Sequence, residues 1–276
     1  MIERQKNLLF LLIIFLYIVW SAPTTYASPR LNTLIEPQDN LSRLLPTRQT
    51  LSGRIVIPYM NQDVPFNSWM KVNPETGRVD LEFVSPLYEI RTTLDSALRI
   101  VESASIILED RLIKKLGYDQ RVTKINTKEK DSIHIEHFLK GRKVKEKDVD
   151  YDYFTFDLDL PQIALQALLL KGIKEFNTDV ILKDRGWRIN INFQLVESKD
   201  LASLASEYEF PPQLKELLKP ESGYYVYVGK ISSILRILYK HKFYCVFSKT
   251  EPHKFVASWG GEPEWVRYVF GQDKVD

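Results

Sequence analysis

The chain has 276 residues, of which 44% are hydrophobic and 27% are charged, and its formal net charge is +2. This ordinary globular balance supports a packed core, and the near-neutral charge argues against binding nucleic acid or acidic membranes through an overall field. The single cysteine, Cys245, excludes an internal disulfide and a CxxC metal or redox motif.

The N-terminus has the three-part pattern of a secretory signal peptide. Arg4 and Lys6 precede an unbroken apolar run from Leu8 to Trp20, and Thr25-Tyr26-Ala27 fits a small-x-small cleavage site. The alternative is a retained membrane anchor, but a spanning helix needs about 20 apolar residues and this run is shorter. We therefore expect export, with cleavage after Ala27.

This pattern divides the chain into three segments. We expect a signal peptide at residues 1–27, an extended lead-in at residues 28–52 and a single β-rich domain at residues 53–272. The product would be periplasmic or secreted, and it would contact the membrane only through the signal peptide before cleavage.

The first elements of the domain are predicted to be strands. Val79, Leu81 and Phe83 alternate with charged neighbours after the turn signal Pro74-Glu75-Thr76-Gly77, so Phe66–Val72 is the first arm of a hairpin.

The segment Thr93–Leu116 has a different period. Its apolar residues recur at three- and four-residue steps, Thr93 suits a helix start, and Gly117 suits a helix end. We expect a helix here. The alternative is strands, because the segment contains the β-branched pairs Ile100-Val101 and Ile106-Ile107.

The middle of the chain returns to strands, with a turn at Gly141-Arg142. The alternation slips by one position between Tyr153 and Phe154, which predicts a β-bulge. Leu160–Leu170 is predicted to be a short apolar helix that ends at Gly172.

A strand with one apolar face is predicted at Trp187, Ile189, Ile191, Phe193 and Leu195, entered through a turn at residues 183–186. A short helix is expected at Pro211–Leu218. Further strands are expected at Tyr224–Val228, Lys242–Ser248, Lys254–Trp259 and Trp265–Phe270.

Two groups of residues have partial metal-site spacing. Asp148, Asp150 and Asp152 alternate as in a calcium loop, but Tyr153 and Asp159 stand where an EF-hand has glycine and glutamate. His134, Glu136 and His137 lack an HExxH frame or an accompanying PCxxC motif. We expect no metal and no cofactor.

Two further features favour structural roles. Cys245 lies between aromatic residues, where a free cysteine behaves as a small buried hydrophobe. The stretch Arg111–Lys147 has twelve Lys or Arg residues against five Asp or Glu residues. It is typical of a solvated surface, although it would also suit anionic head groups.

The order of elements resembles the uncharacterised periplasmic family DUF3108, through Leu165–Phe176, Trp187–Glu197 and Ser258–Tyr268. That family is in turn similar to lipoprotein-carrier proteins, whose curved sheets surround an apolar hollow. The resemblance implies envelope work and binding of an acyl chain, and it transfers no catalytic residue. The helix expected at Thr93–Leu116 departs from the mostly β front half of the family.

The patterns together predict an α+β fold that is mainly β: a curved antiparallel sheet, an open barrel or β-roll, with a few helices packed on one side. The leading functional hypothesis is a non-enzymatic envelope protein that binds a lipid or acyl ligand, or an envelope protein partner. Large side chains at strand spacing would line the ligand site: Phe154, Phe156, Phe193, Tyr225, Tyr227, Phe243 and Phe247.

Two alternatives remain at the level of sequence. One is a periplasmic hydrolase with dispersed catalytic residues, among them His253 or Asp157. The other is a surface scaffold that acts through an exposed sheet edge. A polar cluster in a cleft would favour the hydrolase, and a dry hollow would favour the binding protein.

Overall fold

One continuous sheet of fifteen strands runs through the computed structural model, which describes residues 28–36, 39–125, 132–151, 155–157, 161–197, 209–212, 215, 223–231, 242–260 and 267–272. The strands are β1 (Arg48–Ile57), β2 (Gln62–Val72), β3 (Val79–Val84), β4 (Tyr88–Leu94), β5 (Ile100–Ile107), β6 (Gln120–Ile125), β7 (Ser132–Leu139), β8 (Arg142–Asp150), β9 (Thr155–Asp157), β10 (Glu175–Leu182), β11 (Trp187–Glu197), β12 (Tyr224–Ile231), β13 (Lys242–Ser248), β14 (Phe255–Gly260) and β15 (Arg267–Gln272).

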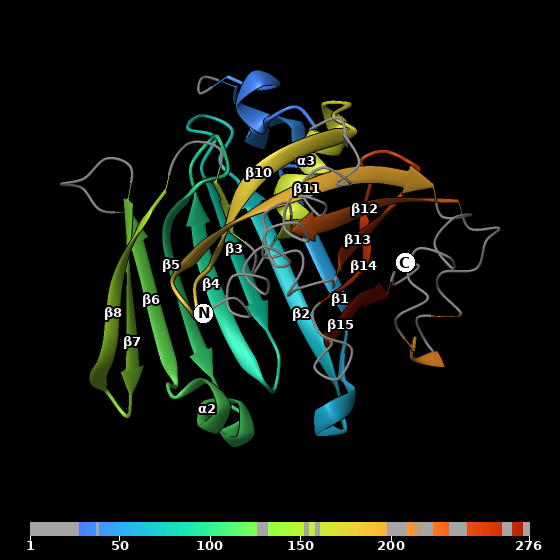
Figure 1. Cartoon of the computed structure of the whole chain (residues 1–276). Helices are drawn as coiled ribbons and strands as arrows, with labels where there is room; N and C mark the ends of the chain where they lie inside the picture. Colours follow the sequence, from blue (N-terminus) through green and yellow to red (C-terminus); the bar gives the residue numbers. More distant parts are fainter. Residues whose placement is uncertain are drawn as a thin grey trace, which may run out of the picture.

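The strand order is β8-β7-β6-β5-β4-β3-β2-β1-β15-β14-β13-β12-β11-β10-β9 (Figure 1). Every neighbouring pair is antiparallel except β9 and β10, which are parallel and connected through helix α3 (Pro161–Leu170). Such a parallel pair needs a crossover, which the helix supplies. The expected curved, mainly antiparallel sheet is therefore confirmed.

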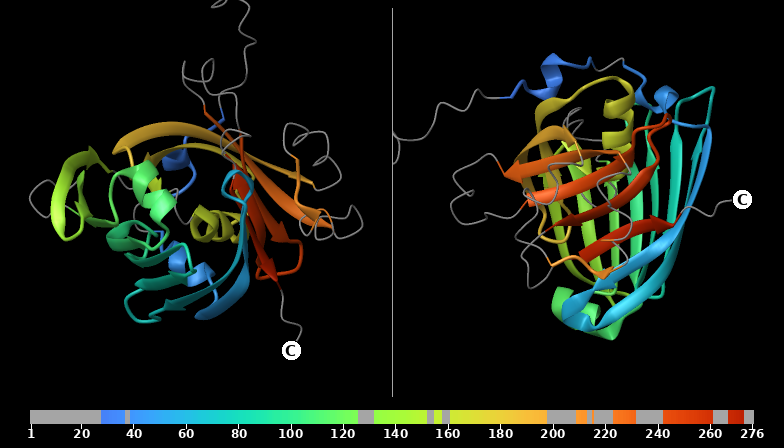
Figure 2. Two further views of the ribbon diagram at one scale, coloured as in Figure 1. Left: turned by 90° about the horizontal axis from the view of Figure 1, so that it is seen from below. Right: turned by 90° about the vertical axis from the view of Figure 1, so that its right-hand side faces the viewer.

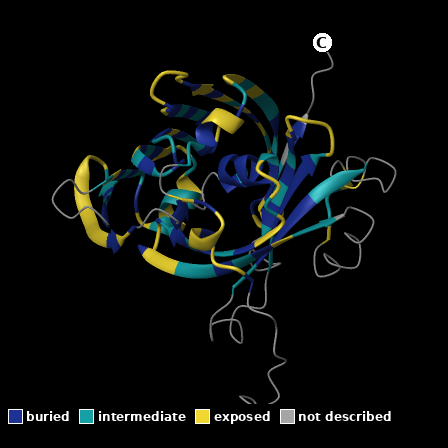
Figure 3. Cartoon of the chain, turned by 90° about the horizontal axis from the view of Figure 1, so that it is seen from above, coloured by how far each residue is buried: buried dark blue, intermediate teal, exposed yellow. Residues whose placement is uncertain are grey.

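The sheet curls around α3, which lies inside the curve (Figure 2). The sequence of α3, PQIALQALLL, is apolar on nearly every side, and eight of its ten residues are buried. A helix of this composition is stable only when it is surrounded. It forms the centre of the largest core cluster, and the outward-facing residues of the strands are the exposed ones (Figure 3).

The short helix expected at Leu160–Leu170 is confirmed. Gly172 follows it with φ +78, and its amide donates to the carbonyl of Leu169 at 2.9 Å. A left-handed residue at this position satisfies carbonyls that the helix end would otherwise leave unpaired, which is why glycine is favoured there.

The helix expected at Thr93–Leu116 is wrong. The chain forms β4, a turn, β5 and the short helix α2 (Asp110–Leu116) instead. The Asp95 carboxylate accepts the amides of Ala97 and Arg99 and so closes the turn. The β-branched residues of β5 then pair with strands on both sides, and only the last third of the segment keeps its helical period.

The β-bulge expected between Tyr153 and Phe154 lies outside the described residues. On either side of that gap, β8 ends at Asp150 and β9 begins at Thr155 on the opposite edge of the sheet. Five residue steps span at most about 18 Å, so the two edges must approach each other at this end.

The first predicted hairpin and most of the C-terminal strands are confirmed: β2 pairs with β3, and β12, β13, β14 and β15 pair in succession. On β11, Ile191 and Phe193 are buried as expected, whereas Trp187 is 44% exposed. Trp187 is the first residue of the strand, and its ring stacks under the Arg185 guanidinium instead of entering the core.

The predicted lead-in contributes to the core before the domain's first strand. It contains two 3₁₀ turns, Leu31–Thr33 and Leu41–Leu44, and its buried side chains include Leu31, Ile35, Leu41 and Leu45.

Most of the helix expected at Pro211–Leu218 lies outside the described residues. Within the described ranges, no helix has the length and apolar content needed to cross a membrane.

Candidate ligand cavity in the concave face

A cavity of about 410 Å³ lies within the curve of the sheet. Its apolar wall comes from three strands and from α2: Ile57, Ile90, Ile107, Leu112 and Leu116. The inward positions of β1, β4 and β5 supply the isoleucines, because alternate residues of a strand face the same side. This volume is within the range typical of small-molecule sites, about 300–1,000 Å³.

A row of polar residues continues the same inner face away from the isoleucines. On paired strands, Ser105 is opposite Arg121, and Arg121 is opposite His137. One step deeper, Ser103 is opposite Thr123. All five side chains are buried. The inner face is therefore apolar on β1 and β4 and polar where Ser105, Arg121 and His137 meet, whereas the inward Ile133 and Ile135 of β7 are apolar again.

The turn between β10 and β11 closes over this polar row. Tyr118 Oη and Arg121 Nη1 both donate to Asp184 Oδ1, while Lys183 Nζ donates to Ser103 Oγ at 3.4 Å. Lys183 is only 1% exposed and Arg121 only 5%. Burying a charge is costly unless the charged group is paired or hydrogen-bonded. These contacts therefore offset the cost of burying Lys183 and Arg121 under the turn.

Cations outnumber anions around the cavity. Five lining side chains are cationic, and Asp184 is the one acidic side chain among the described lining residues. The cations are Lys115, Arg121, Lys183, Arg185 and Arg267. Two of them also stack on tyrosines that line the cavity, Lys115 over Tyr59 at 4.7 Å and Arg267 over Tyr88 at 5.6 Å.

His137 lies at the edge of this positive region as a neutral residue. Burial, and after it the neighbouring Arg121 guanidinium, together lower the pKa of His137 to about 4. Its ring packs against Tyr118, with ring centroids 4.4 Å apart. At neutral pH it therefore adds no charge to the cavity.

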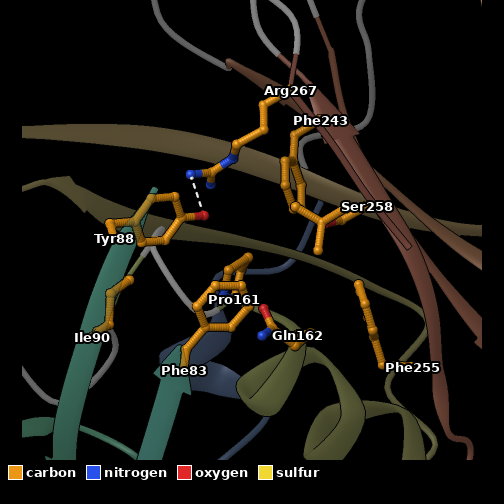
Figure 4. Close-up of a pocket in the computed structure, with 10 residues that line it drawn as sticks. Phe83, Tyr88, Ile90, Pro161, Gln162, Phe243, Phe255, Ser258 and Arg267 are labelled. Carbon is orange, nitrogen blue, oxygen red and sulfur yellow. Dashed lines mark hydrogen bonds between the residues drawn. The ribbon is translucent and has the colours of Figure 1, made fainter. Parts of the chain in front are cut away.

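A second, smaller space of about 40 Å³ adjoins the cavity beside the start of α3 (Figure 4). The two spaces share Tyr88, Ile90 and Arg267, and Arg267 Nη1 donates to Tyr88 Oη at 3.0 Å between them. Phe243 and Phe255 line the far side of the small space. It has room for only a few water molecules.

Four of the seven residues predicted to line a ligand site pack in a different region of the interior. Phe156, Phe193, Tyr227 and Phe247 are buried, and most of these rings contact Phe176, which is 5.1 Å from Phe193. They fill the space beside α3 at ordinary packing distances.

The other three residues predicted to line the site differ in where they lie. Tyr225 is half-buried, Phe243 lines the smaller space, and Phe154 lies outside the described residues. Among the described residues of the set, none lines the larger cavity. Their role as a ligand lining stays a prediction.

The residues of the larger cavity carried a signal that the sequence reading missed. Ser103 and Ser105 interrupt the inward apolar positions of β5, and the turn at residues 183–186 contains three charged residues in a row. Polar residues at inward strand positions mark a polar interior. Because the spacing in Thr93–Leu116 predicts a helix, it does not identify these inward strand positions.

The other charged motifs lie outside the curve. His134 Nδ1 is 2.8 Å from Asp148 Oδ1, and its carboxylate neighbours raise the pKa of His134, chiefly through the hydrogen bond with Asp148. His134, Glu136 and Glu146 have ligand atoms within 4.8 Å of one another. Lys143 already bridges the two glutamates, at 3.2 Å from Glu136 and 2.5 Å from Glu146.

The residues considered for catalysis are not grouped around the cavity. Cys245 is fully buried, which raises the pKa of its thiol and keeps it protonated. His253 Nδ1 contacts the carbonyl of Ser248 at 3.0 Å, and its ring packs edge-on against Tyr225. Asp157 belongs to the edge strand β9.

Comparison with solved structures gave distant likenesses, among them the following two. The chain is similar to a β-barrel-like protein of the domain of unknown function DUF1849 from Brucella abortus, at 6% identity and a TM-score of 0.45, over 82% of this chain and 96% of the other. It is also similar to LprF from Mycobacterium bovis, at 8% identity and a TM-score of 0.20, over 90% and 94% of the two chains.

No protein-family model matches the sequence, and no curated protein matches it. The resemblance to DUF3108 therefore stays a prediction. Because both TM-scores lie below 0.5, we draw nothing about the function of this chain from the two structures.

Proposed function

We propose that this protein is an exported cell-envelope protein that binds a ligand with an acyl chain in the 410 Å³ cavity. The observation that carries the proposal is the apolar wall inside the curve of the sheet, built by Ile57, Ile90, Ile107, Leu112 and Leu116. The support for export is the cationic start and apolar run of the first 20 residues, followed by a small-x-small site.

An acyl chain suits such a wall energetically. Each buried methylene contributes about 0.8 kcal/mol, so ten methylenes would contribute roughly 8 kcal/mol before the entropy of association is subtracted. The small space next to the cavity lies beside the start of α3, along the same inner face (Figure 4). The mostly aromatic cluster around Phe176 packs in the same core as α3.

The test uses the mature protein beginning at Ser28 and a fluorescent fatty acid. We expect the fluorescence to rise on binding and to fall when unlabelled hexadecanoate is added. The variant Leu112→Trp should weaken uptake at least tenfold, because a larger ring on α2 would occupy the cavity. Leu112 is half-buried, so the exchange does not overpack the core of the sheet.

The matched control is Leu108→Trp. Leu108 is 48% exposed, lies just before α2 and does not line the cavity. The Leu108→Trp variant should bind the fatty acid with the same affinity as the unmodified protein. Equal loss in both variants, or no uptake by the folded unmodified protein, would contradict an acyl site in this cavity.

A further inference from the structure

Three of the five cations of the cavity lie together at one end, whereas Lys115 and Arg267 lie beside the apolar wall, over Tyr59 and Tyr88. Arg121 and Lys183 are the deepest of them, and Arg185 belongs to the same turn as Lys183. The apolar wall from β1, β4 and α2 forms the other part of the lining. The cavity therefore combines a cluster of three cations with an apolar wall, which is the pattern that an amphiphile requires.

Asp184 shows that a carboxylate is accepted at the positive end. Its Oδ1 receives hydrogen bonds from Tyr118 Oη and Arg121 Nη1 together. The Asp184 side chain is 45% exposed at the tip of the β10–β11 turn, whereas the Arg121 side chain is 5% exposed. The Asp184 carboxylate therefore reaches the buried Arg121 guanidinium from the solvent side. Donors of this kind hold anions more strongly than neutral hydrogen bonds do.

One carboxylate among five cationic side chains leaves the lining positive. In a partly enclosed site the effective dielectric constant is lower than in water, so this excess attracts a further anion more strongly than an exposed patch would. Lys183 is central to this field, because its ammonium is almost wholly shielded from solvent by the protein.

We propose that the ligand is an amphiphile with an anionic head, a carboxylate or a phosphate, on an acyl chain. The head lies at the end formed by Lys183, Arg121 and Arg185, and the chain lies against Ile90, Ile107 and the leucines of α2. This inference rests on the proposed function and assigns the head group that the acyl site takes.

The experiment compares ligands that share a sixteen-carbon chain and differ in the head. Competition against the fluorescent fatty acid is measured for hexadecanoate, for the phosphate-headed lysophosphatidate, and for the neutral methyl ester and alcohol. We expect at least one anionic ligand to bind about tenfold more tightly than the neutral pair, as charge-assisted hydrogen bonds predict. The tighter of the two anions identifies the source of the head.

Two variants change the charge in opposite directions. Lys183→Met keeps the length of a buried side chain and removes its charge, so it should abolish most of the preference for the anion while leaving the affinity for the methyl ester unchanged. Asp184→Asn keeps a hydrogen-bond acceptor and removes a negative charge, so it should strengthen binding of the anion alone. Lys114→Met, on α2 but outside the cavity lining, should change neither affinity.

The outcomes separate the two proposals. If acid and ester bind equally well, the acyl site stands and the anionic head is overturned. If neither binds, the proposed function itself fails. If Lys183→Met folds and keeps the full preference, Lys183 has no part in binding the head. Should that variant fail to fold, an unchanged affinity of Asp184→Asn for the anion would overturn the proposal instead.

Discussion

At the scale of single residues, two histidines of the same strand respond to opposite environments. Both histidines lie on β7. His137 faces the interior of the protein and is 1% exposed, whereas His134 faces outward beside Asp148. The pKa of His137 is lowered to about 4 by burial and by Arg121, while that of His134 is raised. The alternation of the strand places the two histidines in these opposite environments.

The lowered pKa of His137 makes stability depend on pH. Below the ordinary histidine pKa of 6.5 the unfolded chain binds a proton that the folded protein does not, so the free energy of unfolding falls as the pH drops from 6.5 towards 4. The loss is at most about 3 kcal/mol, given 1.36 kcal/mol per pKa unit. In His137→Leu, the free energy of unfolding measured in urea between pH 4.5 and pH 7 should not show this fall at low pH.

His134→Gln is the control with the opposite sign. The raised pKa of His134 contributes stability that is present below pH 6.5 and is lost as the pH rises through the folded value. Its removal should leave the acid-side loss of the parent protein in place. An unchanged acid-side slope in His137→Leu would show that His137 is not the group that titrates.

The β11 strand shows how far residue patterns predict exposure. Ile191 and Phe193 are buried, as the alternation predicted, while Trp187 is not, although it shares their parity. A pattern of period two predicts which face a side chain is on. It does not predict whether other elements pack on that face at the end of a strand, because those elements are distant in sequence.

At the scale of elements, short strands with clear turn signals were predictable and Thr93–Leu116 was not. Pro74 to Gly77 and the turn at residues 183–186 lie between the expected strands. In Thr93–Leu116, the residues at helical spacing are spread over β4, the turn after it, β5 and α2, and one of them, Leu108, is 48% exposed. Pairing with β3 and β6 decided the outcome, and tertiary pairing of this kind overrides local propensity.

Two glycine turns give a matched test of how turns are packed. Gly77 and Gly141 both have positive φ, +71 and +75. A Cβ on Gly77 would lie 2.8 Å from Ser96 Cβ and 2.9 Å from Ser42 Oγ, whereas a Cβ on Gly141 meets nothing within 4 Å. The turn between β2 and β3 is therefore pressed against the turn between β4 and β5 and against the 3₁₀ turn at Leu41–Leu44.

We expect Gly141→Ala to lower the free energy of unfolding by about 1–2 kcal/mol, through the left-handed backbone alone. Gly77→Ala should add a packing cost of about 1–3 kcal/mol to that loss. Urea unfolding of the two variants under one set of conditions measures the difference. Equal losses would mean that Ser42 and Ser96 move aside without cost.

At the scale of the whole molecule, neither the strand order nor the cavity was visible in the sequence. The edge strands β8 and β9 follow each other along the chain yet lie at opposite ends of the sheet order. The cavity lining runs from Ile57 to Arg267, so its residues meet only because the sheet curls. The sequence predicted a curved sheet around an interior, but local patterns do not specify which strands face each other across it.

Contacts between the β10–β11 turn and the first half of the sheet hold this curl. Arg121 of β6 and Asp184 of the turn are joined by an ion pair, although their strands are far apart in the sheet order. Gly186 lies against the Lys147 side chain of β8, so close that a Cβ there would be 2.6 Å from Lys147 Cδ. The turn therefore bridges two regions of the sheet that are not hydrogen-bonded neighbours.

A double-mutant cycle tests whether this bridge stabilises the curled sheet. We expect Arg121→Met and Asp184→Asn to be coupled by about 0.5–3 kcal/mol in the free energy of unfolding, since one partner is buried and the two side chains share a hydrogen-bond network with Tyr118. The matched pair Arg54 and Asp63, 2.6 Å apart on neighbouring strands and more exposed to solvent at the arginine, should show only about 0.2–1 kcal/mol. Coupling no larger for Arg121 and Asp184 than for the surface pair would mean that the curl is held by the core around α3 alone.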